Sequence, residues 1–392
     1  MNEKLKKIYD GLCLASVFIG VKDKSLFQAF EAYNEAGSLT EKRKAYARFV
    51  SLIYEEGASL TEAVKRVVFE DENVYIKSKA SGKKVPQPVE KAVRAELALF
   101  SEFAALKPCD FALDMALEES EIPAFSSVNA YLYRTYAKRL QNIGRYGYGI
   151  FSSHGMFRLS DTKELEPIAS ADRISMDSFI GYENERAQII ENTRAFVEGR
   201  PASNALLCGD AGTGKSSTVK AVANAFFDEG IRLIELRKDQ LAFLPLVMSK
   251  IVGNPLKFII FIDDLAFNKS DDHFSMLKAS LEGSASAKAD NAVIYATSNR
   301  RHIVKESFAD RDGDDVHIND TLQETLSLSE RFGLVVLFSK PNKALYLEIV
   351  RELAKKNGLQ VNAELDVKAE AFALKKGNRS ARCAEQFIDS LM

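Results

Sequence analysis

Five short, mainly apolar runs set the expected fold of the second half of the chain. They are residues 205–208, 232–236, 258–262, 292–296 and 334–338. Segments long enough for helices separate them, and a strand that is buried on both faces reads as a continuous apolar run. The pattern therefore predicts an α/β fold from about residue 173, with a mostly parallel sheet between two helical layers.

The first 75 residues or so follow a different pattern. Apolar residues recur at three- and four-residue spacing, as in Phe27, Phe30 and Tyr33, which predicts helices. Ser-Leu-Thr-Glu occurs at 38–41 and again at 59–62. Serine followed three residues later by glutamate is the capping-box pattern, in which both side chains bind backbone N–H groups that a helix start leaves open. We therefore expect a helix to begin at each copy.

Two segments between the helical patterns predict irregular structure. Residues 77–88 are rich in Lys, Ser, Gly and Pro, which favours an exposed loop. This basic run could contact a nucleic-acid backbone, although a solvated loop commonly has the same composition. Residues 148–159 alternate around Ser-His-Gly, which predicts a small hairpin with His154 at its tip.

The chain is too long for one ordinary core, at 392 residues. The patterns divide it into a mainly helical N-terminal region at 1–144 and a hairpin with a linker at 145–172. An α/β domain at 173–340 follows. Beyond Pro341 the pattern is purely helical, so we expect a small helical lid at 341–392.

Charge and cysteine usage narrow the classes of function. The 53 Lys and Arg nearly balance the 55 Asp and Glu, and a formal charge of -2 points to neither nucleic acid nor a membrane surface as a general partner. Four scattered cysteines lack metal-site spacing and favour a reducing, cytoplasmic location. The apolar run at 12–19 is too short to span a bilayer, so we expect a buried helix there and no membrane segment.

The segment Gly209-Asp-Ala-Gly-Thr-Gly-Lys-Ser216 fits the pattern GxxxxGK[ST] between an expected strand and an expected helix. Glycines let backbone N–H groups turn towards phosphate oxygens, and the helix N-terminus adds partial positive charge. Lys215 would neutralise the outer phosphates of a nucleoside triphosphate, and Ser216 would bind Mg²⁺. The residues expected to surround the phosphates are Gly209, Asp210, Ala211, Gly212, Thr213, Gly214, Lys215, Ser216 and Ser217.

Two carboxylates follow the strand expected at 258–262. In phosphate-loop proteins an acid at the end of a neighbouring strand holds Mg²⁺, usually through water, and Asp263 takes this position. Asp264 would orient or deprotonate the attacking water, because a strand end beside the phosphate loop gives it reach. The alternative is that Asp264 only caps the next helix.

The strand expected at 292–296 leads into Thr-Ser-Asn299. An amide at this point lies one strand over from the phosphate loop, where it could bind both the attacking water and the terminal phosphate. The alternative is a turn-forming asparagine. We therefore include Asn299 among the candidate catalytic residues, together with Lys215 and Asp264.

Together these segments resemble the AAA+ ATPases over roughly residues 173–392. The resemblance implies a three-layer, parallel-sheet P-loop core with a helical lid, and ATP with Mg²⁺ as ligands. It matches Asp263 and Asp264 to the second acidic motif and Asn299 to the first sensor. Phe179-Ile-Gly-Tyr-Glu183 looks like the box that packs around adenine, which implies that Ile180 and Gly181 lie beside the base.

The same resemblance implies roles for two arginines. Leu328-Ser-Glu-Arg-Phe-Gly-Leu334 is similar to the box with an arginine finger, so Arg331 would reach the nucleotide of the next subunit. Gly377-Asn-Arg-Ser-Ala-Arg382 is similar to the second sensor, with Arg382 the first choice and Arg379 the reserve. For each arginine the alternative is a surface salt bridge.

Within the AAA+ proteins, the chain most resembles a bacterial family of predicted ATPases catalogued as domain of unknown function 815. The phrases Ala296-Thr-Ser-Asn-Arg-Arg-His302 and Ser327-Leu-Ser-Glu-Arg-Phe-Gly333 support this resemblance. AAA+ proteins more often have glutamate at the second acidic position. Aspartate at 264, as in bacterial replication initiators, suits a slow switch better than a fast motor.

The sequence supports two classes of function. The first is an Mg²⁺-dependent ATPase that assembles head to tail into a homo-oligomer and changes what its N-terminal region holds. The second is a nucleotide-gated scaffold or loader that binds a protein or DNA with little hydrolysis. A small-molecule kinase is a weaker interpretation, because Asn299 and Arg331 argue against it. The partner of residues 1–144 is not indicated, and nucleic acid lacks specific support.

Overall fold

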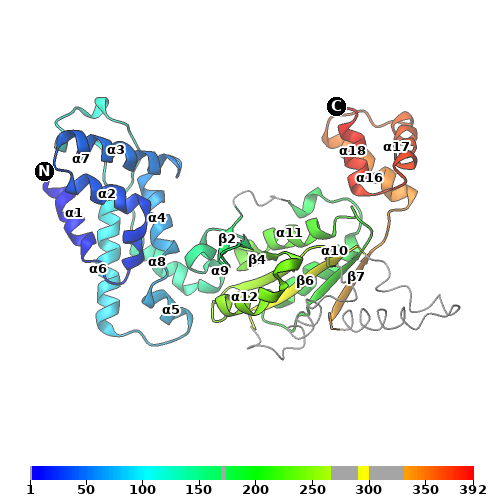
Figure 1. The fold of residues 1–392 in the computed structure, drawn as a ribbon, viewed down its shortest axis with the longest axis horizontal. Coiled ribbons are helices and arrows are strands. Elements are labelled where there is room, and N and C mark those ends of the chain that lie inside the picture. Colours follow the sequence, from blue (N-terminus) through cyan, green and yellow to red (C-terminus); the bar gives the residue numbers. More distant parts are fainter. Residues whose placement is uncertain (1, 169–173, 266–289, 300–330) are drawn as a thin grey trace. The chain divides into compact units, whose positions relative to one another are not determined.

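The computed structural model describes residues 2–168, 174–265, 290–299 and 331–392. The chain forms two compact units, Met1–Ser153 with Gly253–Pro255 and His154–Val252 with Leu256–Met392. Figure 1 shows their elements. In the described part of the chain, every helix is too short or too polar to cross a membrane.

The first unit is helical, as expected. Its α-helices are α1 (Glu3–Cys13), α2 (Ser25–Glu35), α3 (Leu39–Tyr54), α4 (Leu60–Glu70), α5 (Val74–Ala80), α6 (Gln87–Ala104), α7 (Pro108–Asp114), α8 (Leu132–Gln141) and α9 (Ile143–Tyr146). Short 3₁₀ helices span Ile19–Asp23, Glu119–Glu121 and Gly149–Ser152. A core rich in phenylalanine and tyrosine joins the helices, with Phe30, Phe49 and Phe111 packed ring to ring.

Both expected helix starts are present. Ser38 caps α3 in a complete capping box, in which its side chain accepts from the Glu41 N–H and the Glu41 carboxylate accepts from the Ser38 N–H. Ser59 caps α4 and accepts from the Glu62 N–H. The repeated Ser-Leu-Thr-Glu therefore marks two similar helix starts.

The apolar run at 12–19 is not one helix. Helix α1 ends at Cys13, and the chain then turns around the carboxylate of Glu96 on α6. This buried carboxylate accepts hydrogen bonds from the backbone N–H groups of Ser16 (2.8 Å), Val17 (3.1 Å) and Phe18 (2.9 Å), and from the Ser16 hydroxyl (2.9 Å). These bonds satisfy donors that the helix would otherwise have used, so the expected buried helix gives way to a turn in which Val17 and Phe18 are buried.

The basic segment expected to be a loop is partly helical. Helix α5 continues through Lys77 and Lys79 to Ala80, and irregular backbone begins only at Ser81. Asn73 caps this helix by accepting from the Ile76 N–H, and Tyr75 and Ile76 bury its apolar side. The N-cap and the burial of these two side chains stabilise a helix here, although the composition is typical of a loop.

The second unit contains a seven-stranded sheet, and the expected fold class is confirmed. The strand order is β2-β1-β4-β5-β6-β3-β7, and every neighbouring pair is parallel except β1 with β2. The strands are β1 (Met156–Leu159), β2 (Leu165–Pro167), β3 (Ala205–Gly209), β4 (Ile231–Leu236), β5 (Lys257–Ile262), β6 (Ala292–Ser298) and β7 (Leu334–Phe338). All five expected strands are among them.

Helices cover the sheet on both faces (Figure 1). The α-helices of the core are α10 (Glu183–Val197), α11 (Lys215–Ala225) and α12 (Leu244–Ile251), and short 3₁₀ helices span Met176–Ser178, Phe227–Glu229 and Lys238–Phe243. The crossover through α11 runs across the sheet from β3 to β4, and the crossover through α12 runs back to β5. Because such crossovers are right-handed, the two helices lie on opposite faces.

A hairpin does precede the core, but not at the residues expected. Gly149–Ser152 is a 3₁₀ helix, and the hairpin consists of β1 and β2 around residues 160–164. Strand β1 also pairs in parallel with β4, so its residues become part of the main sheet. The alternation of apolar and polar residues at 148–159 therefore comes from a 3₁₀ turn followed by one strand of the sheet. His154 lies between these two elements and not at the tip of a hairpin.

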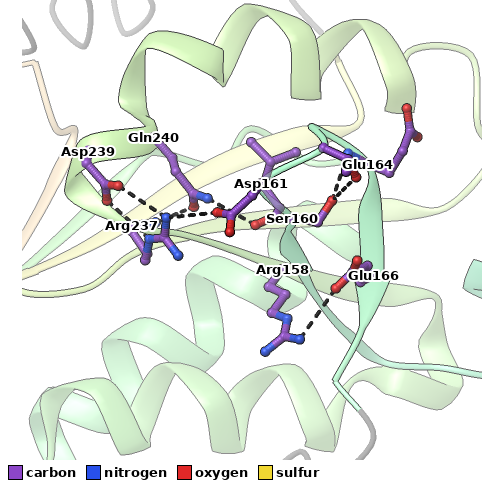
Figure 2. Close-up of polar contacts among 10 residues, drawn as sticks. Arg158, Ser160, Asp161, Glu164, Glu166, Arg237, Asp239 and Gln240 are labelled. Carbon is purple, nitrogen blue, oxygen red and sulfur yellow. Dashed lines mark hydrogen bonds and ion pairs between the residues drawn. The ribbon is translucent and has the colours of Figure 1, made fainter.

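Polar contacts tie this hairpin to the segment after β4 (Figure 2). The amide of Gln240 donates to the Leu159 carbonyl at 3.0 Å, and Arg237 lies 3.5 Å from Asp161 and 3.2 Å from Asp239. Across the hairpin, Arg158 pairs with Glu166 at 3.4 Å. These pairs are exposed and stabilise the hairpin only weakly. The buried Gln240 contact fixes its position.

Three helices follow β7 and form the expected helical lid. They are α16 (Lys343–Lys356), α17 (Ala363–Lys376) and α18 (Ala381–Asp389). Asparagine or serine caps each one, at Asn342, Asn362 and Ser380, and the αL residue Gly377 ends α17. Their facing sides form a separate apolar core around Tyr346, Ala369 and Phe387.

Candidate functional site

The phosphate loop lies at the carboxyl end of β3 and runs into the N-terminus of α11. Gly209 has φ +146°, and a Cβ atom there would lie 2.0 Å from the carbonyl oxygen of Phe338 at the end of β7. Gly214 has φ +86° at the N-cap of α11. Only glycine fits the positive φ at these two positions and the close approach of Phe338 at Gly209. The loop can therefore direct its backbone N–H groups and the N-terminus of α11 towards the same phosphate group.

Lys215 is almost fully buried, with 5% of its surface exposed. Its Nζ donates to the carbonyl oxygens of Gly209 (3.0 Å) and Asp210 (2.7 Å) and to Oδ1 of Asn299 (3.0 Å). Burial lowers the pKa of Lys215, and the nearby Asp210, Asp263 and Asp264 oppose that shift. Three acceptors match the three donors of an ammonium group, which keeps this buried charge hydrogen-bonded.

Ser216 and Asp263, the two expected metal ligands, are in direct contact. The Ser216 hydroxyl donates to Oδ1 of Asp263 at 2.6 Å, and the Thr297 hydroxyl donates to the same oxygen at 2.5 Å. Hydroxyl and carboxylate oxygens are the ligands that Mg²⁺ prefers, and Mg²⁺ usually needs only one or two protein ligands beside water and phosphate. Among the described residues, His, Cys, Asp and Glu form no cluster of three or more that could hold a metal by themselves.

Asp264 adopts a left-handed backbone conformation, with φ +52°. Its N–H donates to the Thr297 hydroxyl at 2.9 Å, and its Oδ1 accepts from Nδ2 of Asn299 at 2.7 Å. Such a conformation is uncommon outside glycine and persists when the surroundings fix it. The hydrogen bonds of Asp264 thus aim its carboxylate at Asn299. Whether it also caps a helix depends on residues from 266, outside the described part.

A cavity of about 160 Å³ adjoins the phosphate loop. Among the residues named from the sequence, Ile180, Gly212, Thr213, Gly214, Ser217 and Arg382 line it. Gly181 does not line the cavity. It has φ +73° and faces the lid, where a Cβ atom would lie 2.4 Å from the side chain of Leu345. Asp210 and Ala211 belong to the loop outside the cavity.

Sequence reasoning missed several residues of this cavity, including Arg186, Ile349, Leu353 and Glu385. The guanidinium of Arg186 lies 5.2 Å from the ring centre of Phe179, and burial lowers its pKa. Burial and Asp389 raise the pKa of Glu385. Ile349 and Leu353 are one turn apart on α16 and so share a face. In the sequence, the four-residue spacing of Ile349 and Leu353 indicates a shared helix face but not what that face contacts.

Thr297 was also missed, although a signal existed. It lies on β6 two residues before Asn299, which directly follows the strand, and residues at that spacing along a strand point to the same side. The hydroxyl of Thr297 bonds both Asp263 and the N–H of Asp264. It therefore orients the acidic pair.

The two lid arginines differ in their surroundings. Arg379 is paired with Glu370 through two hydrogen bonds, Nε to Oε1 at 3.1 Å and Nη2 to Oε2 at 2.9 Å. Arg382 lines the cavity, and its Cβ lies 3.2 Å from where a Cβ of Gly212 would be. The geometry thus favours Arg382 as the residue nearer the phosphate loop.

Arg331 lies at the amino ends of the strands, opposite the carboxyl ends where the phosphate loop lies. It stands just before β7, whose first residue Leu334 pairs with Ala205, the first residue of β3. The phosphate loop follows the last residue of β3, about 16 Å further along a five-residue strand. The arginine and the phosphate loop of one chain therefore lie at opposite ends of the strands. Residues 300–330, which include half of the residues of the two quoted family phrases, lie outside the described part.

Comparisons with known proteins place these features in context. Among solved structures, the RuvB Holliday junction branch migration motor of Thermotoga maritima matches with 15% identity and a TM-score of 0.34, over 56% of this chain and 72% of that one. DnaA from Aquifex aeolicus bound to AMPPCP matches with 18% identity and a TM-score of 0.37, over 57% of this chain and 66% of that one. A search of curated proteins found no match.

A family match covers the second unit. Residues 152–392 match the family described as "Protein of unknown function (DUF815)". This range contains the sheet, the phosphate loop and the lid, and it leaves helices α1 to α9 outside. The chain therefore belongs to the DUF815 family, and its core is the mostly parallel, helix-covered sheet with a phosphate loop that the sequence predicts.

Proposed function

We propose that this protein binds ATP with Mg²⁺ and hydrolyses it to ADP and phosphate within a homo-oligomer. The observation that carries the proposal is the continuous set of hydrogen bonds from Lys215 through Asn299 to Asp264. An ammonium group, an amide and a carboxylate in series are the groups needed to hold a terminal phosphate, align a water and take its proton.

The proposed reaction uses these residues in order. Lys215 would turn its ammonium group from the loop carbonyls to the outer phosphates. Mg²⁺ at Ser216 and Asp263 would neutralise charge on the phosphate oxygens. Asp264 would accept a proton from the water as its oxygen bonds to the terminal phosphorus and the bond to the ADP oxygen breaks. Asn299 would hold that water in line.

The cavity beside Gly212 is the proposed site of the adenine base. Its 160 Å³ is smaller than the usual 300–1,000 Å³ of a small-molecule site, so it suits one flat ring system with the sugar and phosphates outside. Ile349 and Leu353 offer apolar contacts from the lid, and Ile180 offers one from the core. A base bound there would touch both parts, which supports coupling of the lid to the nucleotide through Arg382.

We further propose that Arg331 completes the site of a neighbouring subunit. In its own chain it lies at the amino end of β7, whereas the phosphate loop lies at the carboxyl end of the neighbouring strand β3. A head-to-tail contact would bring this end of β7 to the loop of the next copy, and such contacts build rings or filaments. The nucleotide cycle would change what the N-terminal unit holds. Four free cysteines fit a cytoplasmic location.

Steady-state ATP turnover over a wide range of protein concentration tests the proposal. Turnover per subunit should rise with concentration and vanish in Asp264→Asn, while ATP binding persists in that variant and is lost in Lys215→Ala. Lys220→Ala, on the same helix but paired with Glu235, is the matched control. Turnover per subunit that stays constant at every concentration contradicts the shared site. Full activity in Asp264→Asn contradicts the role of that carboxylate.

A nucleotide-gated binder with little turnover is the second candidate. It is favoured by the strained, shorter acid at 264, whose carboxylate already accepts a hydrogen bond from Asn299. This candidate predicts tight ATP binding, negligible hydrolysis in every variant and a partner that is bound in only one nucleotide state.

A further inference from the structure

The first unit contains a long stretch without negative charge. No Asp or Glu occurs between Glu121 and Asp161, and within this stretch α8 and α9 contribute four basic residues. They are Arg134, Lys138, Arg139 and Arg145. The chain as a whole is nearly neutral, so this segment is a local concentration of positive charge.

The exposed face of α8 combines this charge with aromatic rings. Tyr131, at its start, has 74% of its surface exposed. The guanidinium of Arg134 lies 5.5 Å from the centre of its ring, and Lys138 follows one helical turn later. Within residues 2–168 no carboxylate pairs with Arg134 or Lys138. Their charges are therefore available to an anion.

Further basic and aromatic pairs flank this face. On the side of α6, the guanidinium of Arg94 donates to the Tyr133 hydroxyl at 3.2 Å and lies 5.1 Å from its ring centre. On the other side, Arg139 lies 4.7 Å from the ring centres of both Phe69 and Tyr146. Arginine side chains therefore lie beside aromatic rings on both sides of the exposed face of α8 as well as on it.

A groove adjoins the N-terminal end of α8. Its volume is about 710 Å³, and Tyr131 and Asn129 form part of its wall. Ile8, Ala105 and Ala130 supply apolar surface. Lys4, Lys7 and Lys107 line it beside Glu3 and Glu102, so its charge is nearly balanced. A groove of this kind suits an uncharged flat group, while the phosphates of the same ligand would lie along α8.

The lysine-rich segment noted in the sequence is connected to α8 through α5. Tyr136 of α8 stacks on Tyr75 of α5, with ring centres 6.3 Å apart. Helix α5 leads directly into the exposed Lys83 and Lys84. Lys77 and Lys79 on α5 are paired with Glu72 and Glu90, so the positive charge of this segment comes from Lys83 and Lys84.

We propose that this surface binds single-stranded nucleic acid, with bases stacked on Tyr131 and in the groove beside it and phosphates on Arg134 and Lys138. Single-strand binding combines a basic path for the backbone with exposed rings for the bases. An acidic peptide would use the charges but not the exposed ring. A duplex keeps its bases stacked inside and could not use Tyr131 either.

The test is equilibrium binding of a fluorescent oligodeoxythymidylate to the full chain, without ATP so that the outcome does not depend on the proposed ATPase site. Tyr131→Ala should weaken binding about 10-fold or more, because one base loses its stacking partner. The double variant Arg134→Ala with Lys138→Ala should flatten the dependence of log K on log salt by about 0.7 for each phosphate that these side chains no longer neutralise.

The double variant Lys44→Ala with Arg48→Ala is the matched control. Both residues are exposed on α3, which Figure 1 shows well apart from α8 within the same unit. Affinity should be unchanged in this variant. Circular dichroism should show that all variants remain folded. An oligonucleotide that does not bind overturns the proposal. The proposal is also overturned if Tyr131→Ala binds the oligonucleotide as tightly as the unchanged chain and if a duplex or polyglutamate binds with the same affinity. The surface would then recognise charge alone.

Discussion

Lys215 and Asn299 are in direct contact, with Nζ of the lysine 3.0 Å from Oδ1 of the amide. The other end of the amide donates to Asp264 at 2.7 Å. One side chain therefore connects the residue expected to hold the terminal phosphate with the residue expected to activate water. Neither contact follows from the sequence alone, because Lys215 begins α11 and Asp264 follows β5, whereas Asn299 follows β6.

Asn299→Ala should lower ATP turnover about 100-fold, the usual cost of removing one positioned hydrogen-bond donor from an active site. ATP affinity should change little, because the phosphate loop and Lys215 remain. Turnover and nucleotide affinity measured separately check this. Gln188→Ala, an exposed amide on α10, is the control. A large loss of affinity with unchanged turnover would show that Asn299 serves binding instead.

Arg331→Ala should lower turnover about 10³-fold or more and leave ATP affinity nearly intact, as for arginines that act across a subunit boundary. A mixing experiment isolates the shared site. Arg331→Ala and Asp264→Asn proteins, each inactive alone, should regain turnover when combined, because some interfaces then pair an intact arginine with an intact carboxylate. No recovery in mixtures that do co-assemble would contradict the proposed geometry.

Arg382→Ala and Arg379→Ala should separate nucleotide contact from lid stability. Arg382 lines the cavity, so its loss should weaken ATP binding about 10-fold, as expected for a hydrogen bond to a charged group. Arg379 is paired with Glu370 near the surface, so its loss should destabilise the lid only slightly. Calorimetric titration with ATP and thermal unfolding distinguish the two effects. If Arg379→Ala weakened ATP binding and Arg382→Ala did not, Arg379 would be the residue that contacts the nucleotide.

Glu96→Ala should destabilise the first unit by about 3 kcal/mol, because the backbone N–H groups of Ser16, Val17 and Phe18, the last two of them buried, would lose their charged acceptor. Glu96→Gln keeps one acceptor oxygen and should cost less. Glu102→Ala, an exposed glutamate on the same helix, should change the free energy of unfolding by no more than about 0.5 kcal/mol. Urea unfolding followed by circular dichroism measures all three.

The core strands and the phosphate loop could be predicted because their signals are local. A strand buried on both faces is apolar throughout, and the loop needs glycines at fixed spacing beside a helix start. The turn at Ser16–Phe18 could not be predicted, because it depends on Glu96, distant in the sequence. The cavity residues Ile349 and Leu353 were missed for the same reason. Their position depends on how the lid packs, which no nearby residue signals.

The tight approach between Gly209 and Phe338 has a mechanical consequence. Phe338 ends β7, and only a few residues separate it from Asn342, where the first lid helix begins. Its carbonyl oxygen fills the space that any side chain at 209 would need. The backbone of the phosphate loop therefore rests directly on the stem of the lid. A strain introduced at either place can pass to the other through the main chain itself, without any side chain as intermediary.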